Sequence, residues 1–115
     1  MHAVRVGRSL EVPDTALPQL MHHHGFIIWQ SRGFTGLLGH HKMATIGRSV
    51  LRFVAPEYAP HVLDVIRKPP VRSRLRVELV RADGERVPVN VVGKTVVVQG
   101  LKVRLVDLKK YINTF

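Results

Sequence analysis

Three runs toward the C-terminal end, in which every second residue is apolar, constrain the fold of this chain more than any other feature. The runs cover residues 75–79, 87–91 and 101–105. A period of two places alternate side chains on one face of a β-strand. Asp83-Gly84 separates the first two runs and is a strong hairpin signal. Gly93 and Gln99-Gly100 are interpreted as breaks between the later segments. We therefore predict an antiparallel meander over residues 75–108, with one buried face and one basic, solvated face.

The middle of the chain has the 3.6-residue spacing of helices. Ser31 suits the N-cap of a helix that contains Phe34, Leu37 and Leu38, and Gly39 suits its C-terminal end. Short helical turns are expected over residues 40–56, followed by a longer helix that begins at Pro56 and ends before Pro69-Pro70. The expected core anchors of the short turns are Met43, Ile46, Val50, Leu51 and Phe53.

Two short strands are expected before the helices. The first covers residues 16–21 and is limited by Pro18, which has no N–H to donate. A turn over residues 22–25 leads to a buried apolar strand over residues 26–29. Residues 1–15 are interpreted as an N-terminal arm or a short edge strand, and residues 16–115 as one domain of the α+β class.

The composition restricts the chemistry. At 115 residues the chain has the length of one domain, and it contains no cysteine, which excludes disulfides, thiolate nucleophiles and cysteine-ligated metals. We see no apolar stretch of the roughly 18 residues needed for a membrane span. We therefore expect a soluble, cytoplasmic protein that does not engage a membrane.

The charge balance is strongly basic, with 18 Lys and Arg against 8 Asp and Glu, for a net charge of +10. Such a charge attracts acidic partners, so a nucleic-acid-binding module is one alternative function. The densest basic run, residues 67–76, has no interleaved aromatic residues for base stacking. We therefore favour a solvated basic surface over a nucleic-acid site.

Five segments in this order resemble the motifs of PAS domains. They are Gly25–Gly39, Ile46–Val50, Phe53–Tyr58, Arg81–Val89 and Val106–Leu108. Two positions depart from the family pattern. Ser31 stands where most members have Asn, which changes the local hydrogen bonding, and Lys109 stands where the terminal Thr of the motif would be, which affects how a signal would leave the domain.

The resemblance implies a five-stranded antiparallel sheet with several short helices and one longer helix packed on one face. It also implies a sensory module, of the kind found in two-component systems and transcription regulation, rather than an enzyme. Such a module binds a small ligand or mediates contacts with an effector domain or partner protein. We expect a homodimer that uses the N-terminal arm or the outer sheet.

The resemblance places a ligand pocket between the sheet and the long helix. The expected lining is Leu37, Phe53, Tyr58, His61, Val62, Val65, Leu75, Val77 and Val103. Tyr58, His61 and Val65 share one helical face, and that face could turn inward or outward. In the outward case Val62 and Ile66 make the core contact and His61 lies at the surface.

The cofactor is left open. His61 lies close to where haem-binding PAS oxygen sensors place their proximal histidine, so a haem-binding gas sensor is a second alternative, which we do not favour. Cysteine-dependent flavin photochemistry is excluded. No catalytic residue is predicted, because Gly47-Arg48-Ser49-Val50 lacks the second Gly of a nucleophile elbow. We expect no metal site at His22-His23-His24, which is interpreted as a wet turn.

Overall fold

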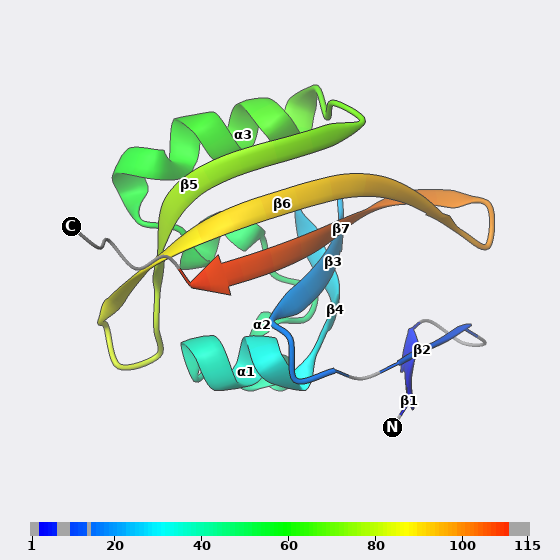
Figure 1. Ribbon diagram of the computed structural model, residues 1–115, viewed down its shortest axis with the longest axis horizontal. Coiled ribbons are helices and arrows are strands. Elements are labelled where there is room, and N and C mark those ends of the chain that lie inside the picture. The colour runs from blue at the N-terminus through cyan, green and yellow to red at the C-terminus, as the bar shows by residue number, and fades with distance from the viewer. Residues whose placement is uncertain (1–2, 7–9, 14, 111–115) are drawn as a thin grey trace.

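A computed structural model describes residues 3–6, 10–13 and 15–110 of the chain, and its main element is a five-stranded antiparallel sheet in the order β4-β3-β7-β6-β5 (Figure 1). The strands of this sheet are β3 (Gln19–His23), β4 (Phe26–Gln30), β5 (Arg72–Val80), β6 (Arg86–Val98) and β7 (Leu101–Lys110). The helices are α1 (Arg32–Leu38), α2 (Lys42–Thr45) and α3 (Ala59–Arg67), with 3-10 turns η1 (Val50–Phe53) and η2 (Pro56–Tyr58). The predicted fold class is confirmed.

The meander forms where the alternating pattern predicts it. β5 pairs with β6 across a turn in which Gly84 has φ of 87°, and β6 pairs with β7 across Gln99-Gly100, with φ of 51° and 79°. Positive φ at both residues suits the twist of a two-residue hairpin turn. The interpretation of Gly93 as a break is wrong, because Gly93 is buried inside β6 and pairs with Val106.

The first strand of the sheet lies further along the chain than expected, whereas the second, β4, begins at Phe26 as predicted. β3 begins at Gln19, directly after Pro18, and includes His22 and His23. The turn is therefore only His24-Gly25, whose φ angles are 51° and 91°. The proline cannot donate to the ladder, which explains why the strand starts beyond it.

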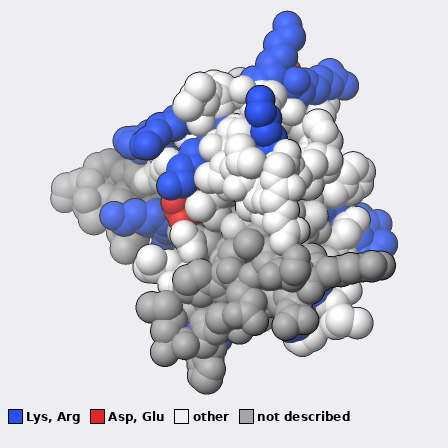
Figure 2. All heavy atoms as spheres, turned by 90° about the vertical axis from the view of Figure 1, so that its right-hand side faces the viewer, with Lys and Arg blue, Asp and Glu red and all other residues white. Residues whose placement is uncertain are grey.

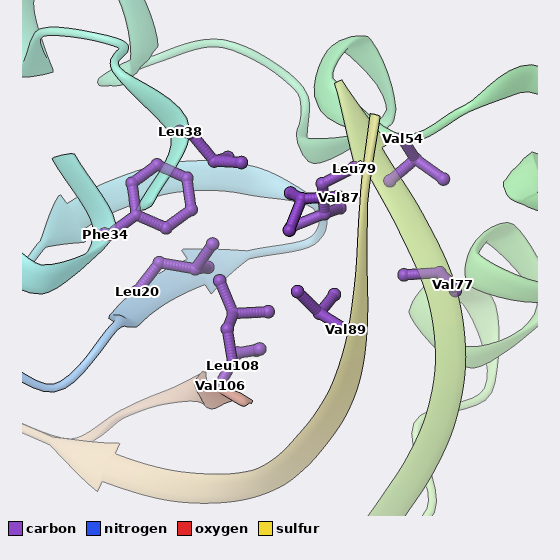
Figure 3. Close-up of a cluster of buried hydrophobic side chains, with 10 residues drawn as sticks. All are labelled: Leu20, Phe34, Leu38, Val54, Val77, Leu79, Val87, Val89, Val106 and Leu108. Carbon is purple, nitrogen blue, oxygen red and sulfur yellow. The ribbon is translucent and has the colours of Figure 1, made fainter. Parts of the chain in front are cut away.

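The helices lie on one face of the sheet, with α3 running along β5 and α1 near the opposite end (Figure 1). Their shared core contains Leu20, Phe34, Leu38, Val54, Val77, Leu79, Val87, Val89, Val106 and Leu108 (Figure 3). Two expected anchors are wrong, since Met43 is 81% exposed and Ile46 is 40% exposed. α2 is a single turn that buries Thr45 instead, whose hydroxyl donates to the side chain of Gln30.

The N-terminal arm forms its own two-stranded sheet. β1 (Ala3–Val6) pairs antiparallel with β2 (Leu10–Pro13), and neither strand joins the five-stranded sheet. The side chains of these residues lie outside the described part of the structure, so their burial against a second copy stays a prediction. Among the described helices, none has the length and hydrophobicity needed to cross a membrane.

Candidate functional site

A cavity of about 80 Å³ lies between α3 and the inner face of the sheet. Five of the residues predicted from the sequence line it: Phe53, Val62, Val65, Leu75 and Val77. Val62 and Ile66 face the cavity from α3, as in the second of the two orientations expected from the sequence, and Val65 lines the cavity beside them. In that orientation His61 is exposed at the surface.

The other four predicted pocket residues lie elsewhere. Leu37 packs against the core from α1, and the Tyr58 hydroxyl is 3.5 Å from a carboxylate oxygen of Glu78. Val103 is buried on the opposite face of the sheet, next to Met21 and Trp29. Apolar residues lie on both faces of β7, with Leu105 on the face of Val103 and Val106 on the face of Arg104, and only the folded sheet shows which face lies under the helices.

The site does not fit haem. His61, which would have to ligate the iron, is exposed and outside the cavity lining. The cavity volume of about 80 Å³ is also far below the roughly 300–1,000 Å³ of pockets for larger ligands.

The cavity has a polar end, which is dominated by Arg104. This side chain projects from β7 onto the inner face, and the residue is only 5% exposed. One terminal guanidinium nitrogen donates to the Pro70 carbonyl and, at 2.8 Å, to the Thr95 hydroxyl, with a longer 3.5 Å contact to the Val71 carbonyl. The other donates at 2.8 Å to the Ser73 hydroxyl. Arg104 thus ties β7 to β5, β6 and the segment after α3.

Gly93 makes room for this guanidinium. A Cβ atom at position 93 would lie 2.9 Å from Arg104 Nε and 2.9 Å from Ser73 Oγ. Such an approach is closer than van der Waals contact allows. The glycine is therefore required by the packing of the arginine against β6, and not by a turn.

His22 is the second polar side chain of the cavity. Its Nδ1 accepts a 3.0 Å hydrogen bond from the backbone N–H of Gly25. Burial, with smaller contributions from Arg104, His23 and His24, lowers the pKa of His22 to about 4. The imidazole is therefore neutral at physiological pH, and its remaining proton resides on Nε2.

A larger hollow of about 390 Å³ adjoins the cavity. The two spaces share the side chains of His22, Val65, Ile66 and Arg104. Lys102 and the His23-His24 pair also line the larger hollow. Arg104 and His22 thus lie between a small, mostly apolar cavity and a wider, basic one.

Sequence reasoning missed Arg104, because the alternation of Leu101, Val103 and Leu105 assigned it to the solvated face. Val106 and Leu108 are the signal that could have placed it, since they share its face and are buried. Gly93 on the neighbouring strand was a second signal.

The remaining candidates do not converge. No group of three potential metal-ligating side chains occurs within the described ranges. The rings of His23 and His24 lie 4.1 Å apart, whereas His40 contacts the Phe53 ring and the Val80 carbonyl. On the face shown in Figure 2, Lys and Arg side chains lie in separate groups around uncharged surface. That distribution is not a continuous nucleic-acid track on this face.

Several solved PAS domains share this architecture. The PAS domain of an HTR-like protein from Haloarcula marismortui matches with a TM-score of 0.75 and 20% identity, over 83% of this chain and 81% of that one. The Cycle PAS-B domain of Drosophila melanogaster with bound ethylene glycol gives 0.73 and 9%, over 83% and 100%. A PAS domain from a two-component sensor histidine kinase gives 0.70 and 9%, over 84% and 86%. No protein-family model and no curated protein matches the sequence.

Proposed function

We propose that this chain, which has the PAS fold, is a sensory signalling module that binds a small molecule between its sheet and α3. The observation that carries the proposal is the cavity itself, which combines an apolar wall with two polar side chains, the buried Arg104 and the half-buried His22. Small-molecule sites commonly have this composition, in which apolar area provides affinity and a few polar groups fix orientation. The proposed role is binding and signalling, without catalysis.

The structure offers a route by which occupancy of the cavity reaches the rest of the molecule. α3 contributes Val62, Val65 and Ile66 to the cavity, and Gly25 in the β3–β4 turn packs against Ile66. Arg104 joins β7 to the segment that follows α3. A ligand that shifts α3 or Arg104 would therefore alter the sheet and the β3–β4 turn, and a partner that contacts either of them would respond to the change.

We propose that the partner is a second copy of the chain, an effector domain or another signalling protein. The projecting β6–β7 hairpin supports association, since Val97 is 65% exposed and Leu101 is 47% exposed near its tip (Figure 1). Light scattering of the purified chain measures this directly. A monomeric mass at tens of micromolar, unchanged by deleting residues 1–14, would contradict the homodimer.

Ligand binding is tested by thermal-shift screening of small molecules against the wild-type chain and two valine variants. Val65→Phe fills the cavity from α3, whereas Val97→Phe makes the same change at an exposed site. We expect a compound that raises the melting temperature of wild type and Val97→Phe but not of Val65→Phe. Equal stabilisation of all three proteins, or no stabilising compound in a broad screen, would contradict the proposal.

A further inference from the structure

Arg104 is a buried cation without a carboxylate partner. The residue is 5% exposed, and its hydrogen-bond acceptors are all neutral carbonyl or hydroxyl oxygens. None of the carboxylates in the described part of the chain pairs with it. Burying a charge away from water is unfavourable unless it is paired and fully hydrogen-bonded. Burial accordingly lowers the pKa of this guanidinium, although it stays charged.

One nitrogen of this guanidinium has no hydrogen-bond partner. Arg104 Nε is buried and has no hydrogen-bond partner, while both terminal nitrogens are engaged. A buried N–H without an acceptor is rare in folded proteins and indicates a place where an acceptor belongs. Arg104 is also among the residues that line both hollow spaces.

His22 adds a second donor of the right kind. Because its Nδ1 accepts from the Gly25 N–H, the neutral ring carries its proton on Nε2. The ring cannot accept a second hydrogen bond in this tautomer. His22 lines the same two spaces as Arg104, so a second N–H donor lies at the polar end of the cavity.

The surroundings favour negative charge. Neither space has an Asp or Glu in its lining, and the wider one adds Lys102. The rest of the small cavity is apolar, with Val65, Leu75 and Val77 among its walls. A single water needs roughly 10–15 Å³ of such space, so about 80 Å³ admits a compound of only a few heavy atoms.

We propose that Arg104 and His22 form an anion subsite for a short-chain aliphatic monocarboxylate, whose carboxylate lies against Arg104 and whose alkyl tail enters the apolar cavity. This inference rests on the proposed ligand-binding function and names the class of ligand. The carboxylate supplies the acceptor that Arg104 Nε lacks, and the counter-charge that the described residues do not provide. Guanidinium groups match carboxylates in both charge and planar geometry.

The test compares sodium butyrate with butyramide, which has nearly the same shape but no charge. Isothermal titration calorimetry at constant ionic strength measures both affinities, and NMR follows the ¹⁵Nε–¹H resonance of Arg104 during each titration. We expect butyrate to move that resonance and to bind at least tenfold more tightly than butyramide, since a hydrogen bond to a charged group contributes that much. This comparison uses the wild-type chain, so it does not depend on a variant folding.

Two variants that each remove one positive charge complete the test. Arg104→Gln should weaken butyrate binding at least tenfold, whereas Arg52→Gln, at an exposed position, should leave it unchanged. Equal loss in both variants would show attraction by net charge alone and overturn the inference. Binding of butyrate without a shift of the Arg104 Nε resonance would overturn it as well.

The two levels of the proposal fail in different ways. Butyramide or another neutral compound could bind wild type and fail to bind Val65→Phe, while butyrate binds neither protein. In that case the ligand-binding function stands and the anion subsite is wrong. If neither butyrate nor any neutral compound binds wild type, both are wrong. If inorganic phosphate binds as tightly as butyrate and moves the same resonance, the site takes anions without using the apolar cavity, and the assignment to alkyl carboxylates is wrong.

Discussion

The Ser31 hydroxyl makes three hydrogen bonds at the junction of β4 and α1, so Ser31→Ala should destabilise the fold more than loss of an ordinary helix cap. Ser31 Oγ accepts from the Phe34 N–H at 3.2 Å, which is the helix cap, and from the Gln19 N–H at 2.9 Å. It donates to the Leu17 carbonyl at 2.6 Å. The residue is 1% exposed, so no water can take the place of the hydroxyl without rearrangement.

The magnitude follows from these bonds. Loss of an N-cap costs about 0.5–2 kcal/mol. A buried group left without its partner costs about 1–3 kcal/mol, but Leu17 is exposed and its carbonyl can turn to water, which reduces this part. We expect a total of about 2–4 kcal/mol. With a urea slope of about 1–3 kcal/mol/M, the unfolding midpoint falls by roughly 1–4 M.

The assay is equilibrium unfolding in urea, followed by the fluorescence of Trp29, which is the only tryptophan and is 6% exposed. Ser49→Ala is the matched control, because Ser49 also caps a helical turn but its hydroxyl only accepts from the Leu51 N–H, at 3.2 Å. We expect this control to lose only about 1 kcal/mol. If Ser31→Ala is no more destabilising than Ser49→Ala, the reasoning from the three bonds is refuted.

Three further predictions concern the cavity and the surface. Gly93→Ala should lose about 1–3 kcal/mol because its Cβ would lie 2.9 Å from Arg104 Nε, whereas Gly36→Ala, which meets no neighbour within 4 Å, should gain about 0.5–1 kcal/mol in urea unfolding. His22 has a pKa of about 4 when folded and about 6.5 when unfolded, so the free energy of unfolding should fall by about 1–3 kcal/mol as the pH drops from 6.5 to 4. His22→Asn, which keeps an acceptor for the Gly25 N–H, should lack this part of the acid dependence, and an unchanged profile would contradict the assignment. Any binding to a DNA duplex should collapse between about 50 and 200 mM salt, and tight, sequence-selective binding at the higher salt would favour the nucleic-acid alternative.

Local signals in the sequence determined most of the element order. Ser31 and Gly39 bound α1 because a hydroxyl cap and a left-handed glycine act on backbone groups within the same turn. Asp83-Gly84 and Gln99-Gly100 place the hairpin turns for the same reason. These signals, together with the resemblance to PAS domains, predicted the five-stranded antiparallel sheet with helices on one face, and the resemblance alone placed a pocket beside the long helix.

What only the tertiary structure decided is which face of each element turns inward. β7 has apolar residues on both faces, so the sequence alone could not tell whether Val103 or Arg104 lies under the helices. Similarly, residues 61 and 62 point about 100° apart on α3, and a helix of this length can bury either side. The pairing of β7 with β3 and β6 decides which of its alternate residues face the helices. The packing of Val62 and Ile66 decides which side of α3 faces the sheet. Because these choices depend on contacts between residues far apart in the chain, Arg104, His22 and Gly93 came together only in the folded molecule.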